Sequence, residues 1–73
     1  RYFIIAGAFG SKRHANKLVY RLKLWDYTNA RIMGQSKSGL YRVCYDGFVH
    51  AEDATTVLQK VKQKNADAWL LSL

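Results

Sequence analysis

The fold is decided by the stretch YFIIAGAF at residues 2–9 and by its counterpart 39 residues further on. At this offset Tyr2 falls on Tyr41 and Phe9 on Phe48. The same offset also pairs Ala15 with Ala54, Leu18 with Val57, Leu22 with Val61, Lys23 with Lys62 and Ile32 with Leu71. Repeats of this length usually mark one supersecondary unit that cannot bury its apolar face alone. We therefore expect the two copies to close on each other as one domain over residues 1–73.

The first copy predicts a strand, a helix and a second strand. Residues 2–9 are apolar, rich in aromatic and β-branched side chains, and followed by Gly10 and Ser11, as is typical of a strand. Ser11 is a suitable N-cap for a helix. The expected apolar stripe of that helix is Ala15, Leu18, Val19, Leu22 and Trp25. Residues 28–33 predict a strand and residues 34–39 a turn.

The second copy repeats this order. Residues 40–45 predict a strand, residues 50–64 a helix and residues 67–72 a last strand. The expected stripe of this helix is Ala54, Val57, Leu58 and Val61. The order β-α-β-β-α-β predicts an α+β domain of ferredoxin-like type, which RNP domains share. It has a four-stranded antiparallel sheet, two helices on one face and a pseudo-twofold internal repeat.

Alternation along the strands divides the sheet residues between two faces. The expected helix side holds Tyr2, Ile4, Ala6, Ala30, Ile32, Tyr41, Val43, Tyr45, Trp69 and Leu71. The expected open face holds Phe3, Ile5, Gly7, Arg31, Met33, Leu40, Arg42, Cys44, Leu70 and Ser72. An exposed apolar patch beside two arginines indicates a binding surface. The alternative is that a partner domain or an oligomer interface covers this face.

Charge and composition narrow the class of partner. The formal net charge is +7 and the sequence pI is about 9.9, which favours anionic partners such as nucleic acid, anionic lipid or acidic polysaccharide. Cys44 is the only cysteine, which excludes an internal disulfide and a cysteine-based zinc site. No apolar run is long enough to span a bilayer. The chain reads as a domain excised from a longer protein, and we expect a monomer.

No residue pattern indicates catalysis. The segment between Gly7 and Arg13 lacks the spacing of a phosphate loop, and His14 and His50 have no ligand partners at metal-binding spacing. Asp46 and Asp53 form no pair with a base or nucleophile. We therefore expect a non-enzyme without a metal or cofactor.

Several segments in order resemble SPOR (sporulation-related repeat) domains of bacterial cell-envelope proteins. They are AGAF at residues 6–9, the helix start with SK at 11–12 and ANKL at 15–18, GLYRV at 39–43, GF at 47–48 and DAW at 67–69. Together they cover the whole chain. Ile5, Ala8, Leu40 and Cys44 depart from the family pattern, whereas Arg42 matches it.

The resemblance implies a peptidoglycan-binding module that prefers glycan strands lacking stem peptides. It also implies a parent protein on the periplasmic side of the cell envelope, targeted to the cell wall or the division septum. The expected glycan-binding residues are Phe3, Ile5, Arg31, Met33, Leu40, Arg42 and Leu70. Sugar C–H surfaces would pack on the apolar side chains, and a muramic acid carboxylate would pair with Arg31 or Arg42.

Two other binding functions remain open. The open face could hold a protein partner. An RNA-recognition motif has the same topology, but it stacks bases on outward aromatics of its first and third strands. Here the outward positions of the third strand are Leu40, Arg42 and Cys44, so only Phe3 would stack, and we expect no nucleic acid.

Overall fold

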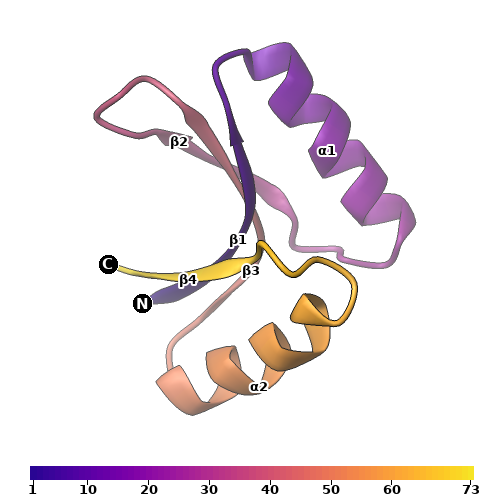
Figure 1. The fold of residues 1–73 in the computed structure, drawn as a ribbon, viewed down its shortest axis with the longest axis vertical. Helices are drawn as coiled ribbons and strands as arrows, with labels where there is room; N and C mark the ends of the chain where they lie inside the picture. The colour runs from indigo at the N-terminus through magenta and orange to yellow at the C-terminus, as the bar shows by residue number, and fades with distance from the viewer.

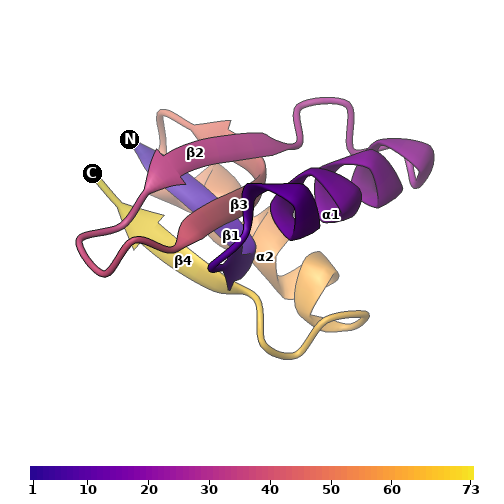
Figure 2. The same ribbon diagram turned by 90° about the horizontal axis from the view of Figure 1, so that it is seen from above.

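The computed structural model describes all residues 1–73 and confirms the α+β topology. The elements are β1 (Tyr2–Phe9), α1 (Lys12–Leu24), β2 (Arg31–Gln35), β3 (Tyr41–Phe48), α2 (Ala51–Lys62) and β4 (Trp69–Ser72). The four strands form one antiparallel sheet in the order β2-β3-β1-β4. Both helices lie on the same side of this sheet, and the other side carries no helix (Figures 1 and 2).

Most element boundaries differ from the expected ones by a few residues. β2 begins at Arg31 rather than residue 28, β3 continues to Phe48, and β4 begins at Trp69. Residues 28–30 belong instead to the connection after α1, where the Ala30 N–H donates a hydrogen bond to the Tyr27 carbonyl at 3.1 Å. Ser11 is the N-cap residue of α1, but its side chain makes no capping hydrogen bond.

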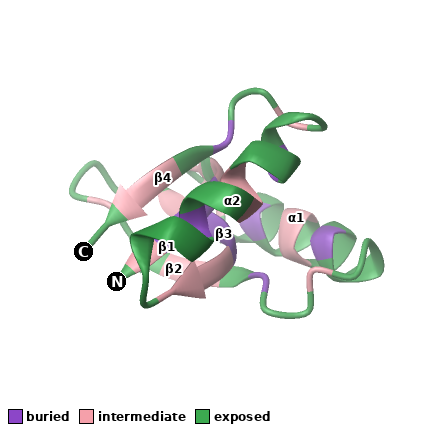
Figure 3. Cartoon of the chain, turned by 90° about the horizontal axis from the view of Figure 1, so that it is seen from below, coloured by how far each residue is buried: buried purple, intermediate pink, exposed green.

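The core lies between the helices and the sheet. Its buried members are Ile4, Ala15, Leu22, Ala30, Val43, Tyr45, Val61 and Ala68. Figure 3 shows α1 alternating between buried and exposed colours along its length, as expected for a helix that lies on a sheet. The predicted stripe holds except at Trp25, which is the C-cap of α1 and is 61% exposed.

Two bulges set the register of the central strand pair. Ile4 faces Asp46 and Ile5 faces Cys44, which leaves Tyr45 as an extra residue in β3. Gly7 then faces Val43, which leaves Ala6 as an extra residue in β1 and restores the register. The second bulge turns Gly7 toward the helices, where an added Cβ would lie 3.6 Å from Leu18 Cδ2. The prediction that Gly7 faces outward is therefore wrong.

One side chain ties the two bulges together. The Asn65 amide donates hydrogen bonds to the Ala6 carbonyl at 3.3 Å and to the Tyr45 hydroxyl at 3.2 Å. The Tyr45 ring also packs edge-on against Tyr27, with ring centroids 4.7 Å apart. The bulged backbone therefore keeps a hydrogen-bond partner inside the domain.

The two ends of the chain meet at the edge of the sheet. The Arg1 amino group donates to the Leu73 carbonyl at 2.7 Å, and the Leu73 N–H donates to the Arg1 carbonyl at 2.9 Å. Figure 1 shows both termini side by side at the end of the molecule away from α1. Neither helix has the length and apolar content that crossing a membrane would require.

Candidate functional site

A row of four side chains crosses the open face from one edge strand to the other. Trp69 of β4 faces Ile5 of β1, Ile5 also faces Cys44 of β3, and Cys44 faces Arg31 of β2. Directly paired residues of antiparallel strands project to the same side, so the four share one face. At about 4.8 Å per strand, the row is about 14 Å long. It has an aromatic side chain at one end and a cation at the other.

The two middle residues of this row belong to a second, smaller hydrophobic core, which forms the floor of the open face. Ile5 and Cys44 are fully buried and Phe3 is only 8% exposed, with Met33 and Leu71 packed against them. The expectation of an exposed apolar patch at Phe3 and Ile5 is therefore wrong. Both residues lie on a central strand, where side chains from neighbouring strands on either side cover them. The open face therefore presents to solvent the side chains around this cluster, which we call the rim, and not the members of the cluster.

Arg31 is held over the floor by two contacts. Its Nη1 donates to the Asn29 carbonyl at 2.8 Å, and its guanidinium lies 5.8 Å from the centre of the Phe3 ring. An added Cβ at Gly47 would lie 3.2 Å from Arg31 Nη2 and 2.8 Å from Phe3 Cε1. Glycine at position 47 is thus what lets the ring and the cation approach the backbone of β3. Arg31 remains exposed on its outer side.

Arg42 has the expected orientation. It faces Ala8 across the β1–β3 pair, whereas its neighbours Tyr41 and Val43 pack in the core below the helices. Arg42 is half-buried, and its side chain donates to none of the hydrogen bonds within the domain. It is therefore the open-face cation that is free to take an anionic ligand.

The prediction for β4 is wrong by one residue. Leu70 packs against the main core on the helix side, and Leu71 faces Phe3 on the open side. A one-residue shift in a strand moves every side chain to the opposite face. Leu70 is therefore not part of the open face, whereas Trp69, expected on the helix side, belongs to it.

The sequence pattern missed two open-face residues, the half-buried Leu71 and the exposed Trp69. Trp69 is 42% exposed at the end of the row and offers a large flat apolar surface with one polar N–H. Leu40 lies in the hairpin one residue before β3 and is 38% exposed. The hairpin is fixed by a 2.8 Å hydrogen bond from the Ser36 N–H to the Leu40 carbonyl.

Cys44 is the nucleophilic side chain of the open face. Burial raises the pKa of the Cys44 thiol above its ordinary value, and the nearby Arg31 charge opposes this only in part, so the thiol is neutral. No group of three or more His, Cys, Asp or Glu side chains is placed to hold a metal ion. A rim of aromatic, aliphatic and guanidinium groups suits a ligand that carries both C–H surfaces and carboxylates.

The fold and this face define a small binding module, and comparison with known families specifies which one. Residues 1–72 match the SPOR domain, so the chain belongs to the SPOR domain family. This family is known for binding peptidoglycan in cell-division proteins of the cell envelope, and it is not a family of enzymes. Neither the curated proteins nor the solved structures gave a match.

Proposed function

We propose that this domain is a non-catalytic module that binds peptidoglycan glycan strands lacking stem peptides through the open face. In this role it directs its parent protein to the cell wall or division septum on the periplasmic side of the envelope. Family membership supports peptidoglycan as the ligand. The observation that carries the proposal is an open face with exposed Trp69 and Arg31 at the two ends of its buried floor, and with the unpartnered Arg42 beside that floor.

The glycan ligand and the open face match in two respects, apolar surface and charge. The faces of pyranose rings present C–H groups, which pack well on an indole ring and on aliphatic side chains such as Leu40. Removal of a stem peptide frees the lactyl carboxylate of N-acetylmuramic acid, which a guanidinium binds through two parallel hydrogen bonds. Arg42 has no internal partner, so it is the group we assign to this carboxylate. A strand that keeps its peptides has no such carboxylate.

The proposed ligand-contacting set differs from the one expected from the sequence. It keeps Arg31, Met33, Leu40 and Arg42, adds Trp69 and Leu71, and omits Leu70, which faces the helices. Phe3 and Ile5 act from beneath as the floor that holds the rim in place. Arg31 contributes charge while it is anchored to Asn29 and Phe3.

The test is sedimentation of the domain with sacculi before and after amidase treatment. We expect stronger binding after treatment, and we expect Arg42→Ala to weaken it by about 1–3 kcal/mol, as for a charge-assisted hydrogen bond. Trp69→Ala should weaken it by about 2 kcal/mol, as for an interface tryptophan. The matched control is Trp25→Ala, because Trp25 is also exposed but lies on the helix layer.

Salt and competition separate the ligand classes. Sugar–apolar contact persists when Coulomb attraction is screened, so added salt should weaken glycan binding only in part. RNA binding would fall steeply with salt through counterion release. Equal binding to both kinds of sacculi, abolished by single-stranded RNA, would contradict the proposal. Failure to bind either kind would favour a protein partner on the open face.

A further inference from the structure

The outer face of α1 carries a concentration of positive charge that glycan binding does not use. The helix contains Lys12, Arg13, Lys17, Arg21 and Lys23 and no acidic residue. All five side chains are exposed, and none makes a hydrogen bond within the domain. Figures 1 and 2 show that α1 lies on the helix side of the sheet, away from the open face.

Two of these five cations lie where they oppose helix stability, whereas Arg21 and Lys23 lie in the last turn, where the dipole favours them. The partial positive charge at a helix N-terminus disfavours cations in the first turn. α2, the equivalent helix of the repeat, has Glu52 and Asp53 in its first turn, as the dipole favours. α1 has Lys12 and Arg13 at its start and no acidic residue in its first turn. A feature that opposes local stability in only one of two equivalent helices indicates a functional requirement on that helix.

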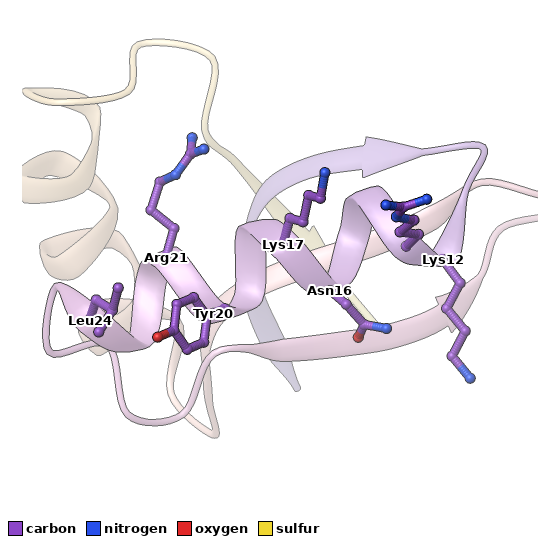
Figure 4. Close-up of a pocket in the computed structure, with 7 residues that line it drawn as sticks. Lys12, Asn16, Lys17, Tyr20, Arg21 and Leu24 are labelled. Atoms are coloured by element: carbon purple, nitrogen blue, oxygen red, sulfur yellow. The ribbon is translucent and has the colours of Figure 1, made fainter.

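Tyr20 and Leu24 line the same surface as these cations, and Trp25, the residue after Leu24, lies at the end of this surface and lines a neighbouring hollow. Tyr20 is 68% exposed, Leu24 64% and Trp25 61%. Figure 4 shows Tyr20 and Leu24 on α1 next to Lys17 and Arg21, around a shallow hollow along the helix. A partner recognised by charge alone would not require exposed Tyr, Leu and Trp. Cations interleaved with such side chains match the interface of an anionic membrane, where headgroups bind the cations and the apolar groups enter the acyl boundary.

We propose that the outer face of α1, with Trp25 at its end, docks on an anionic phospholipid surface. Charge complementarity selects anionic lipid, and the exposed Tyr20, Leu24 and Trp25 select a bilayer over a soluble polyanion. This docking is independent of glycan binding because the two surfaces lie on opposite layers of the domain. Together the two surfaces would let one small domain bridge the membrane and the cell wall.

The two tryptophans make a direct experiment possible, since Trp25 lies on the helix layer and Trp69 on the open face. In Trp69→Phe, Trp25 is the only tryptophan, and its emission reports on the proposed membrane contact. We expect a blue shift on addition of vesicles of phosphatidylglycerol and phosphatidylcholine, and none with vesicles of phosphatidylcholine alone. Lys17→Glu with Arg21→Glu in this background should weaken partitioning at least about tenfold.

The matched control reverses the same amount of charge on the other helix. Lys60→Glu with Lys62→Glu changes exposed lysines of α2, and it should leave partitioning within about threefold of the parent. Circular dichroism melting of both double variants checks that they fold. Equal loss in both pairs would overturn the proposal, because only net charge would then matter. Binding to heparin without any binding to vesicles would also overturn it, in favour of a soluble polyanion.

A failure of this proposal is distinguishable from a failure of glycan binding. The charge-reversed α1 variant should sediment normally with amidase-treated sacculi, and Trp69→Ala should still bind vesicles. Loss of both activities on changing α1 would show that one surface serves both ligands, which contradicts two separate faces.

Discussion

At the scale of single residues, the open face is built on a buried thiol rather than on exposed apolar groups. Cys44 is fully buried, and its pKa is raised above 9.0, chiefly because burial disfavours the thiolate. The unfolded chain therefore ionises at lower pH than the folded one. The stability that this difference provides is complete below pH 9.0 and is lost as the pH rises through the folded pKa.

We therefore expect the wild-type domain to lose more stability than Cys44→Ala when the pH is raised above 9.0. The two proteins share every other ionisable group, so the comparison isolates Cys44. Urea unfolding on both sides of this pH measures the difference. A parallel decline in the two proteins would show that Cys44 is not desolvated.

Gly47 has an equally specific role. Because an added Cβ would lie 2.8 Å from Phe3 Cε1, Gly47→Ala must displace the Phe3 ring and the Arg31 guanidinium above it. We expect a loss of about 1–3 kcal/mol in the free energy of unfolding, as for other overpacked sites. The control is Gly10→Ala, since no atom lies within 4 Å of a Cβ built there. Equal stability of the two variants in thermal melts would contradict this packing.

At the scale of elements, the bulges in β1 and β3 depend on Asn65. Asn65→Ala removes the hydrogen bonds to the Ala6 carbonyl and the Tyr45 hydroxyl. We expect a loss of about 1–3 kcal/mol in the free energy of unfolding, because a part-buried carbonyl is left without its partner. Asn16→Ala, at an exposed position on α1, is the control and should change stability by less than about 0.5 kcal/mol. Denaturant unfolding of both variants measures this. Similar values for the two would show that Asn65 does not support the bulges.

The repeat explains both what the sequence predicted and where it failed. The 39-residue offset correctly relates Ala15 to Ala54 and Leu22 to Val61, and with them the strand–helix–strand order. After the helices the true offset is one residue shorter, since the buried Ala30 corresponds to the buried Ala68. The missing residue lies in the connection after α2. There Asn65 N–H bonds to Val61, whereas after α1 Tyr27 N–H reaches back one residue further, to Leu22.

Because of this one-residue difference, the sequence prediction assigned the side chains of β4 to the wrong faces of the sheet. The extra residue after α1 is Asp26, which adopts a left-handed conformation with φ of 71° and has no counterpart after α2. Alternation within β4 could not reveal the shift, because Leu70 and Leu71 are the same residue type. The orientation of Arg31, Met33 and Arg42 was predicted correctly because the alternating residues of β2 and β3, such as Ile32 and Val43, do face the helices. The error came from transferring the phase of β2 to β4 at the 39-residue offset. The burial of Phe3 and Ile5 was not, because it depends on neighbours from three other strands.

At the scale of the whole molecule, the repeat makes the row from Trp69 to Arg31 nearly symmetric. Ile5 and Cys44 are equivalent positions at the 39-residue offset. Arg31 and Trp69 are equivalent positions at the offset that applies after the helices, which is one residue shorter. The pseudo-twofold relation thus places an aromatic and a cation at equivalent ends of a shared apolar floor. The helices carry the opposite surface, where α1 alone is strongly basic. A domain of 73 residues therefore presents two chemically distinct faces.

Glycan recognition by the open face is tested most directly by the fluorescence of Trp69 in the Trp25→Phe variant during titration with soluble glycan strands prepared by amidase digestion. We predict a saturable shift in Trp69 emission, which is lost in Arg42→Ala and is absent when the strands keep their stem peptides. Trp25 in the Trp69→Phe variant should not respond to the same strands. A response of Trp25 without one of Trp69, or equal responses of Trp69 to both kinds of strand, would contradict recognition of peptide-free glycan by the open face.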